Sequence, residues 1–173
     1  MAEKTVTIFG TSRAVSGDAV YGLAYTLGKL LARAGFAVAN GGYGGTMLAA
    51  AKGAAEAGGK AIGVTCSAFS STPNEYVTQQ VNTASLDERL DKLIELGNAY
   101  VVLAGGTGTL LELAKVWELK NKSFLKTQKP IILMGGFWQP LIKLIETDDP
   151  DAAQHVHIVA GPDEAVDDVI SNM

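Results

Sequence analysis

The residues best suited to chemistry lie in and beside a glycine-rich turn, Gly105-Gly106-Thr107-Gly108-Thr109, which follows an apolar run and precedes a helical pattern. Glycine has no Cβ, so the backbone N–H groups of such a turn can approach a ligand closely. The first N–H groups of the following helix are unpaired and carry partial positive charge, which suits a phosphate. The hydroxyls of Thr107 and Thr109 add further donors. The turn is therefore a candidate phosphate site at the start of a helix.

Two further apolar runs end in similar turns. Gly10, Thr11 and Ser12 follow the first run, and a second glycine run after Asn40 contains Gly41, Gly42, Gly44 and Gly45. In α/β folds, ligands bind at the carboxyl ends of the strands, near the point where the strand order reverses. The named nucleotide motifs do not match, because the third glycine of GxGxxG and the whole of GxxxxGK[ST] are missing.

Glu112 is the most informative charged residue, and two interpretations of it remain open. Thr109-Leu110-Leu111-Glu112 fits a capping box, in which the Glu112 carboxylate would return to the Thr109 N–H. The alternative is a carboxylate directed at the ligand that the glycine turn holds.

Arg89 follows a second capping box, Ser85-Leu86-Asp87-Glu88, in which Glu88 is the expected cap. Arg89 then lies in the second turn of a helix, at the edge of its apolar face. The sequence allows a solvated arginine or a guanidinium turned toward a phosphate or carboxylate.

Short apolar runs alternate with helical patterns along the chain, which predicts the elements that must position these residues. The expected strands cover residues 4–9, 36–39, 60–65, 76–81, 99–103, 130–134 and 155–159. The expected helices cover residues 16–34, the stretch from the second glycine run to 57, and residues 86–96, 110–120, 138–146 and 163–170. This order predicts a Rossmann-like three-layer α/β sandwich with a mostly parallel sheet flanked by helices. No linker or composition shift interrupts it, so residues 1–173 are expected to form one nucleotide-binding domain.

Composition excludes several classes of function. The net charge is −4, the pI is about 5.1 and no basic cluster is present, so no nucleic-acid partner is expected. No apolar run approaches the ~20 residues of a membrane helix, and no secretory signal pattern is visible, so a cytoplasmic protein is expected. The single cysteine, Cys66, cannot form an intramolecular disulfide, and no metal site is predicted. Small molecules are the expected partners.

Together, these motifs resemble those of the LOG family, the cytokinin-activating phosphoribohydrolases often labelled "possible lysine decarboxylase". The segment Gly105–Glu112 resembles the family's PGGxGTxxE motif, and Asn40–Met47 resembles its GGGxxGLM run. Phe9–Ser12 is similar to the CGSS turn, and Ser85–Arg89 is similar to the start of the MHERKxxM segment. The resemblance extends to about Ile145, with the motifs in the family's order.

The resemblance implies hydrolysis of the N-glycosidic bond of a purine nucleoside 5′-monophosphate, such as AMP or a modified AMP. The products would be the free base and ribose 5-phosphate, with no cofactor required. It also implies that Glu112 and Arg89 are catalytic, that the three glycine turns with Thr109 and Met47 bind the substrate, and that the protein is a homodimer or a larger homo-oligomer. The chemistry is coherent, because positive charge grows on the ribose and a carboxylate can stabilise it or take a proton from water.

Six positions depart from the family's motifs: Ala104 replaces a proline, Asn40 a glycine, Thr46 a leucine, Asp87 a histidine, Leu90 a lysine and Leu93 a methionine. These departures indicate a divergent branch. The alternative function is therefore a non-catalytic carrier or binding protein for a nucleotide or a phosphorylated, molybdopterin-type cofactor. A pyridoxal-phosphate decarboxylase is a third hypothesis, but no lysine in these motifs marks a Schiff base.

Overall fold

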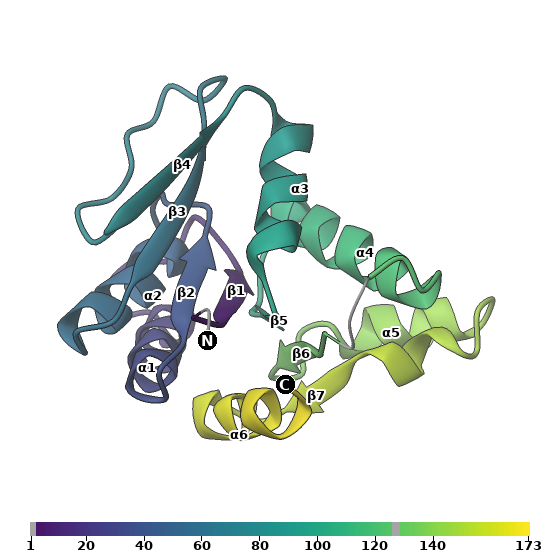
Figure 1. Cartoon of the computed structure of the whole chain (residues 1–173). Helices are drawn as coiled ribbons and strands as arrows, with labels where there is room; N and C mark the ends of the chain where they lie inside the picture. The colour runs from purple at the N-terminus through teal and green to yellow at the C-terminus, as the bar shows by residue number, and fades with distance from the viewer. Residues whose placement is uncertain (1–2, 126–128) are drawn as a thin grey trace.

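The structure, a computed structural model, describes residues 3–125 and 129–173, which form a sheet between two layers of helices (Figure 1). All seven strands are parallel to their neighbours, in the order β4-β3-β2-β1-β5-β6-β7. The strands are β1 (Thr5–Phe9), β2 (Ala37–Asn40), β3 (Ala61–Cys66), β4 (Gln79–Thr83), β5 (Ala99–Val102), β6 (Ile131–Met134) and β7 (His157–Val159).

The helices divide between the two faces of the sheet. They are α1 (Ala19–Arg33), α2 (Thr46–Glu56), α3 (Leu86–Leu96), α4 (Thr107–Asn121), α5 (Gln139–Glu146) and α6 (Pro162–Asn172), with a short 3₁₀ helix, η1 (Ala152–His155). Side chains of α1, α2 and α6 form one apolar core with the sheet, and those of α3, α4, α5 and η1 form another. The predicted three-layer α/β fold is confirmed. Among the described residues, no helix is long and apolar enough to cross a membrane.

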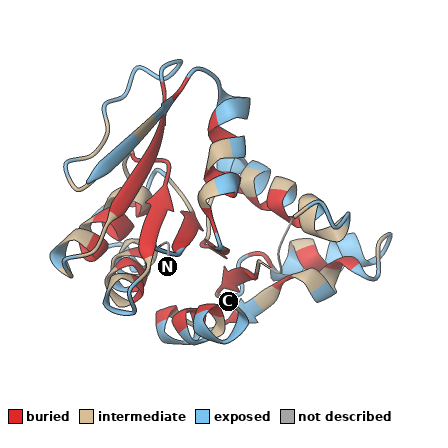
Figure 2. Ribbon diagram, viewed as in Figure 1, coloured by how far each residue is buried: buried red, intermediate tan, exposed pale blue. Residues whose placement is uncertain are grey.

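The central strand β5 shows why the sheet is covered on both faces. Its four residues are apolar and buried (Figure 2). Successive side chains of a strand point to opposite faces. Accordingly, Val101 packs into the α1–α2–α6 core, while Tyr100 and Val102 pack into the α3–α4–α5 core. An uninterrupted apolar strand is stable only when both of its faces are buried, as in a parallel sheet.

The order of strands places the reversal point between β1 and β5. From β1 the chain builds outward through β2 and β3 to β4, and it then returns to pair β5 with the other edge of β1. Helices leaving neighbouring strands on either side of this point lie on opposite faces, which leaves a crevice at the carboxyl ends. The first and third glycine turns follow β1 and β5, so both lie at this crevice.

Four predicted boundaries are wrong by a few residues. Helix α1 begins at Ala19 with Asp18 as its N-cap residue, and not at Ser16. Strand β4 begins at Gln79 because Asn74 forms a turn before it, with its Oδ1 accepting the N–H of Tyr76 at 3.1 Å. Asparagine commonly folds back on the backbone two residues later, and this ends extended structure.

The two other corrections concern the last strand and the fourth helix. His155 closes the η1 helix, so β7 contains His157 and not the whole predicted range 155–159. Helix α4 begins at Thr107 and not at Leu110, because the Leu110 N–H already donates to the carbonyl of Gly106 at 2.9 Å. This earlier start changes the interpretation of Glu112.

Candidate active site at the glycine turns

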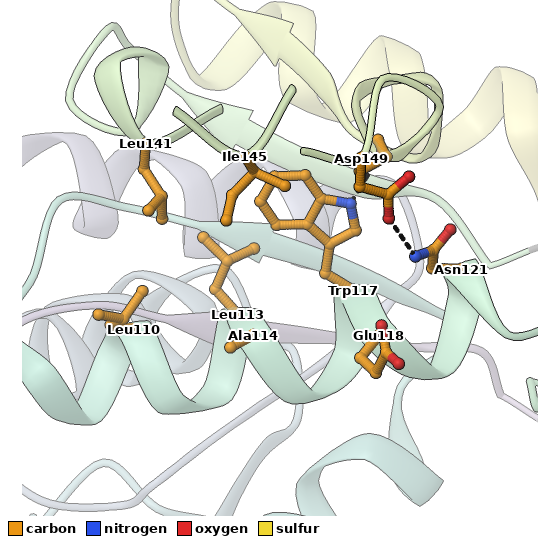
Figure 3. A pocket seen from close by; sticks show the side chains of 10 residues that line it. Leu110, Leu113, Ala114, Trp117, Glu118, Asn121, Leu141, Ile145 and Asp149 are labelled. Atoms are coloured by element: carbon orange, nitrogen blue, oxygen red, sulfur yellow. Dashed lines mark hydrogen bonds between the residues drawn. The ribbon is translucent and has the colours of Figure 1, made fainter. Parts of the chain in front are cut away.

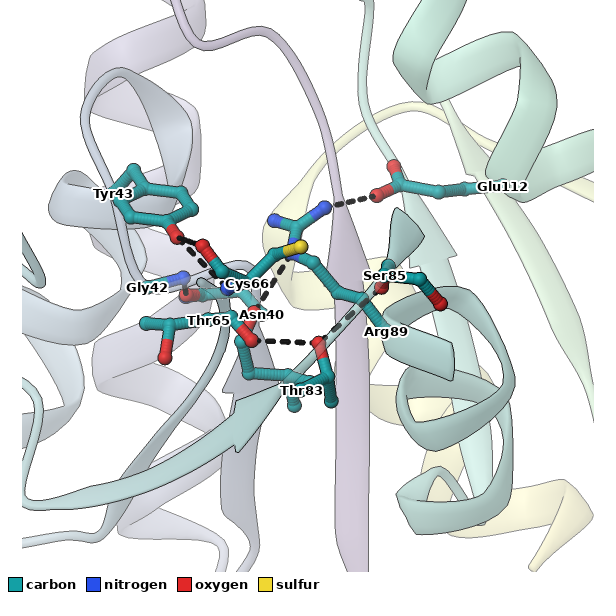
Figure 4. A network of polar contacts seen from close by, with 10 residues as sticks. Asn40, Gly42, Tyr43, Thr65, Cys66, Thr83, Ser85, Arg89 and Glu112 are labelled. Carbon is teal, nitrogen blue, oxygen red and sulfur yellow. Dashed lines mark hydrogen bonds and ion pairs between the residues drawn. The ribbon is translucent and has the colours of Figure 1, made fainter. Parts of the chain in front are cut away.

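Two charged side chains from separate helices meet beside the carboxyl ends of the strands (Figure 4). Arg89 comes from the first half of α3 and Glu112 from the first half of α4. Nη1 of Arg89 lies 4.0 Å from Oε1 of Glu112, and the two side chains are only 9% and 16% exposed. The two residues predicted to be catalytic therefore form a largely buried ion pair.

The Arg89 side chain is held against the sheet. Its Nε–H donates to the carbonyl oxygen of Val64 in β3 at 2.8 Å. Gly41 provides the space for the guanidinium, because a Cβ at this position would overlap Nη2 of Arg89 and would lie 2.6 Å from Sδ of Met47. Of the two interpretations that the sequence allows, the solvated arginine is wrong, and the guanidinium turned toward a carboxylate is confirmed.

The cap of α3 fixes the turn from which Arg89 projects. Oγ of Ser85 accepts the N–H of Glu88 at 3.1 Å, and Oε2 of Glu88 accepts the N–H of Ala84 at 2.7 Å. The predicted capping role of Glu88 is confirmed, although its carboxylate reaches the residue before Ser85. Such caps satisfy N–H groups that the helix itself leaves unpaired.

Glu112 is not the cap of α4. The helix begins at Thr107 with Gly106 as its N-cap residue, so Glu112 lies in the second turn, beyond reach of the free N–H groups. Burial raises the pKa of Glu112 to about 7, and the positive charge of Arg89 opposes part of that rise. A carboxyl group with a pKa near neutral pH can exchange a proton with a substrate or a water molecule.

The first glycine turn contacts the other two. The Thr11 N–H donates to the carbonyl of Ala104, just before the third turn, at 3.2 Å. The Thr11 carbonyl accepts both the backbone N–H of Thr46 at 2.9 Å and its hydroxyl at 3.0 Å. Gly10 leaves room for this hydroxyl, since a Cβ at residue 10 would overlap it. The first turn therefore connects the other two.

Asn40 organises the second turn from within. Its Oδ1 accepts the N–H of Gly42 at 2.8 Å, and its Nδ2 donates to the carbonyl of Met47 at 3.0 Å. Gly42 has a φ of +77°, in the left-handed region that favours glycine. A glycine at residue 40 could not make either side-chain bond.

The end of the second turn lies directly against the first turn. Gly45 also has a positive φ, of +65°, and a Cβ there would overlap the backbone of Thr11 and Ser12. A Cβ at Gly44 would lie 3.8 Å from the Ser12 carbonyl oxygen. The close approach of these two turns therefore depends on the missing side chain of Gly45.

The third turn presents its backbone at the start of α4. Gly106, Thr107 and Gly108 are exposed, and the first N–H groups of α4 have no acceptor within the helix. Thr109 is buried, with its side chain against Gly105, where a Cβ would overlap Oγ1 of Thr109. The predicted location of this turn at a helix start is confirmed, while binding of a phosphate there stays a prediction.

Two aromatic residues that the sequence did not single out lie beside Arg89. The Cζ atom of Arg89 lies 5.6 Å from the ring centroid of Tyr43 and 5.5 Å from that of Phe69. Tyr43 belongs to the second glycine run, and Phe69 belongs to the irregular loop after β3. An aromatic side chain in a loop of small polar residues is a signal that could have marked Phe69.

A separate apolar groove of about 290 Å³ lies on α4, between it and α5 (Figure 3). Leu113 and Trp117 line it from α4, and Leu141 and Ile145 line it from α5. The indole N–H of Trp117 donates to the carbonyl of Ala152 at 2.9 Å. Neither member of the ion pair lines this groove, so it is distinct from the glycine turns.

Comparison with known proteins agrees with the motifs. The family model described as "Possible lysine decarboxylase" matches residues 47–169. The chain belongs to this family, the LOG family. A cytokinin riboside 5′-monophosphate phosphoribohydrolase from Rhodococcoides fascians is 28% identical over 149 residues, which cover 83% of this chain and 74% of that enzyme.

Solved structures of another kind resemble this LOG-family chain over almost its whole length. The molybdenum cofactor binding protein of Rippkaea orientalis has a TM-score of 0.81 at 25% identity, covering 99% of this chain and 98% of that one. The molybdenum cofactor carrier protein of Chlamydomonas reinhardtii has a TM-score of 0.77 at 28% identity, covering 98% of both chains. This chain is therefore similar both to a protein named as an enzyme and to proteins named as cofactor carriers.

Proposed function

We propose that this protein is a phosphoribohydrolase that cleaves the N-glycosidic bond of a purine nucleoside 5′-monophosphate, such as AMP or a modified AMP. The observation that carries the proposal is the Arg89–Glu112 ion pair, with 4.0 Å between Nη1 and Oε1, beside three connected glycine turns. The enzyme named in Rhodococcoides fascians supports the same substrate class.

The glycine turns would hold the 5′-phosphate. The exposed residues Gly106, Thr107 and Gly108 present backbone N–H groups at the positive end of the α4 dipole. Phosphate bound there would place the ribose within reach of the second turn of α4, where Glu112 lies. Arg89 would pair with the ligand or balance the charge of Glu112 and the leaving base.

The chemistry is a substitution by water at C1′ of the ribose. Positive charge grows on the ribose ring as the C1′–N bond breaks, and the ionised Glu112 carboxylate would stabilise it. The water oxygen bonds to C1′ and one of its protons passes to Glu112. The base leaves with the electron pair of the broken bond and takes up a proton from the solvent, and Glu112 later returns its proton to the solvent. A pKa of about 7 lets Glu112 accept the proton and release it again near neutral pH.

The decisive substitution is Glu112→Gln, which keeps the shape of the side chain but removes its charge and its basicity. We expect the rate of base release from the monophosphate to fall about 100-fold or more, while the protein stays folded. The measurement is chromatographic quantification of free base and ribose 5-phosphate, with circular dichroism as the check of folding.

Glu95→Gln is the matched control, because Glu95 lies at the end of α3, is exposed, pairs with Lys92 at 2.9 Å, and does not line the apolar groove. It should release base at the wild-type rate. A wild-type chain that releases no base from any of a panel of monophosphates would end the enzyme proposal. Full activity of Glu112→Gln would remove Glu112 from the mechanism.

A second candidate is a carrier of a nucleotide or of a phosphorylated, molybdopterin-type cofactor. It is favoured by the molybdenum cofactor proteins of Rippkaea orientalis and Chlamydomonas reinhardtii, which match along nearly the whole chain. Mass spectrometry of the purified protein discriminates the two functions. A tightly held phosphorylated pterin without turnover of monophosphates would favour the carrier.

We further propose that the protein is a homodimer, as the family resemblance implies. Several apolar side chains on α4 and α5 are exposed, among them Leu111 at 43% and Leu144 at 65%. They lie on the two helices that form the apolar groove. A second copy of the chain is the proposed occupant of this surface.

A further inference from the structure

Arg89 rests against a pair of tilted aromatic rings. The ring centroids of Tyr43 and Phe69 lie 5.8 Å apart, with an angle of 56° between the ring planes. The Cζ atom of Arg89 is 5.6 Å and 5.5 Å from the two centroids. The three groups thus form a nearly equilateral triangle, with the cation within the ~6 Å range of a cation–π interaction for each ring.

Tyr43 and Phe69 both bond to the backbone of Cys66, the last residue of β3. The Tyr43 hydroxyl accepts the N–H of Cys66 at 2.9 Å and donates to the Cys66 carbonyl at 3.2 Å (Figure 4). The Phe69 N–H donates to the same carbonyl at 3.0 Å. Farther along the loop, Nδ2 of Asn74 donates to the carbonyls of Gly42 and Tyr43 at 3.1 Å and 2.8 Å. The loop and the second glycine run are therefore tied together.

The other contacts of Arg89 do not fix the orientation of its guanidinium. The bond from Nε to the Val64 carbonyl holds one point of the group. Gly41 only leaves space, and the 4.0 Å separation from Glu112 is longer than a hydrogen bond. The rings of Phe69 and Tyr43 supply further contacts that can fix the orientation of the guanidinium.

We propose that Phe69 is a positioning residue: with Tyr43 it holds the Arg89 guanidinium toward Glu112 and limits the access of water to the pair. This inference rests on the proposed function, because it assigns Phe69 a part in the same reaction. Phe69 is 40% exposed, so it forms the outer side of the aromatic pair, while Tyr43 forms the inner side. Excluding water strengthens the attraction between opposite charges, because the local dielectric constant is lower.

The first test measures the position of Arg89 without any substrate. The sequence contains three arginines, Arg13, Arg33 and Arg89, and the first two are exposed. In ¹⁵N-labelled wild-type protein, the Arg89 Nε–H should therefore give the slowly exchanging arginine side-chain signal, identified by its loss in Arg89→Lys.

The substitution Phe69→Leu keeps an apolar side chain but removes the ring. We expect hydrogen exchange of the Arg89 Nε–H to accelerate about tenfold, as the loss of a partly desolvated cation–π contact predicts. Phe69→Tyr keeps the ring and should keep the slow exchange. Phe124→Leu is the matched control, because Phe124 is 72% exposed on the segment after α4. Unchanged exchange in Phe69→Leu would overturn the proposal.

The second test measures the rate of base release. We expect kcat to fall about tenfold in Phe69→Leu with KM nearly unchanged, and to recover in Phe69→Tyr. A raised KM with unchanged kcat would overturn the positioning role and assign Phe69 to contact with the ligand. The two tests bear on different proposals. Absent base release in the wild type would contradict the proposed function, whereas the exchange measurement would still decide whether Phe69 positions Arg89.

Discussion

At the scale of single residues, the departures from the family's motifs have structural reasons in this chain. Asn40 bridges Gly42 and Met47 with its side-chain amide, and the Thr46 hydroxyl holds the Thr11 carbonyl. Asn40 therefore adds hydrogen bonds within the second turn, and Thr46 adds one that joins the second turn to the first.

The departures in the arginine segment act on packing. Leu90 and Leu93 are buried in the core beneath α3, and Asp87 is exposed in the first turn of the helix. An acidic residue there interacts favourably with the positive end of the helix dipole. Arg89 keeps its ion pair with Glu112 beside these three changes.

The raised pKa of Glu112 makes a prediction about stability. Between pH 4.5 and about 7, the folded protein holds a proton on Glu112 that the unfolded chain has released. The free energy of unfolding therefore falls as pH rises through this window, by about 3 kcal/mol from this group. Glu112→Gln cannot ionise, so it does not lose this stability as pH rises. The variant should be as stable as wild type at pH 4 and more stable than wild type by about 3 kcal/mol at pH 8.

Urea denaturation of both proteins at the two pH values measures this difference. Other titrating groups are shared by the two proteins and cancel in the comparison. Glu95→Gln, whose carboxylate is exposed, should track wild type at both pH values. An equal stability difference between wild type and Glu112→Gln at pH 4 and pH 8 would contradict a raised pKa at Glu112.

At the scale of elements, the close packing of α1 on α2 sets the position of the second glycine turn. A Cβ at Gly28 in α1 would overlap the Ala50 carbonyl, and one at Gly53 in α2 would overlap the Tyr25 carbonyl. The two helix backbones therefore touch without side chains between them. Helix α2 begins directly after Gly45, at the end of the second glycine turn. The distance between α1 and α2 therefore also sets where the second turn contacts Thr11.

Gly28→Ala should therefore destabilise the protein, by about 2–3 kcal/mol, because the added methyl group must push α1 and α2 apart. The measurement is the midpoint of thermal or urea unfolding. Gly22→Ala is the control on the same helix: Gly22 is exposed and has no atom within 4 Å of an added Cβ. It should gain about 0.5–1 kcal/mol from helix propensity. Equal effects at the two positions would contradict backbone contact between the helices.

At the scale of the whole molecule, the apolar surface on α4 and α5 predicts self-association. Light scattering should give twice the chain mass of 18.0 kDa. Ile145 lines the groove, and Ile145→Asp would bury a charge in the interface, so it should convert the dimer to a monomer.

Ile170→Asp is the matched control for this surface. Ile170 is also an exposed isoleucine, but it lies on α6, which covers the opposite face of the sheet. This variant should stay dimeric. A monomeric wild type would contradict the prediction of a dimer, and a dimeric Ile145→Asp would move the interface away from the groove.

Much of the architecture could be predicted from the sequence, because it depends on short-range patterns. The apolar run Ala99–Leu103 marks a strand buried on both faces, and the spacing of Leu90, Leu93 and Ile94 marks the inner face of α3. Ser85 and Glu88 mark its cap. The error at the start of α4 arose because Thr109 fitted a cap, whereas Gly106, three residues earlier, is the N-cap residue.

By itself, the sequence determined the order of strands and helices, the three glycine turns at strand ends, and the identity of Arg89 and Glu112 as candidates. Only the tertiary structure decided that these two side chains face each other, that Thr46 joins the second turn to the first, and that Tyr43 and Phe69 lie beside the guanidinium. Capping and periodicity act between residues about four apart or closer, within one element. The Arg89 site combines residues from β3, two loops and two helices. The distances between these residues are set only when the strands have taken their order in the sheet.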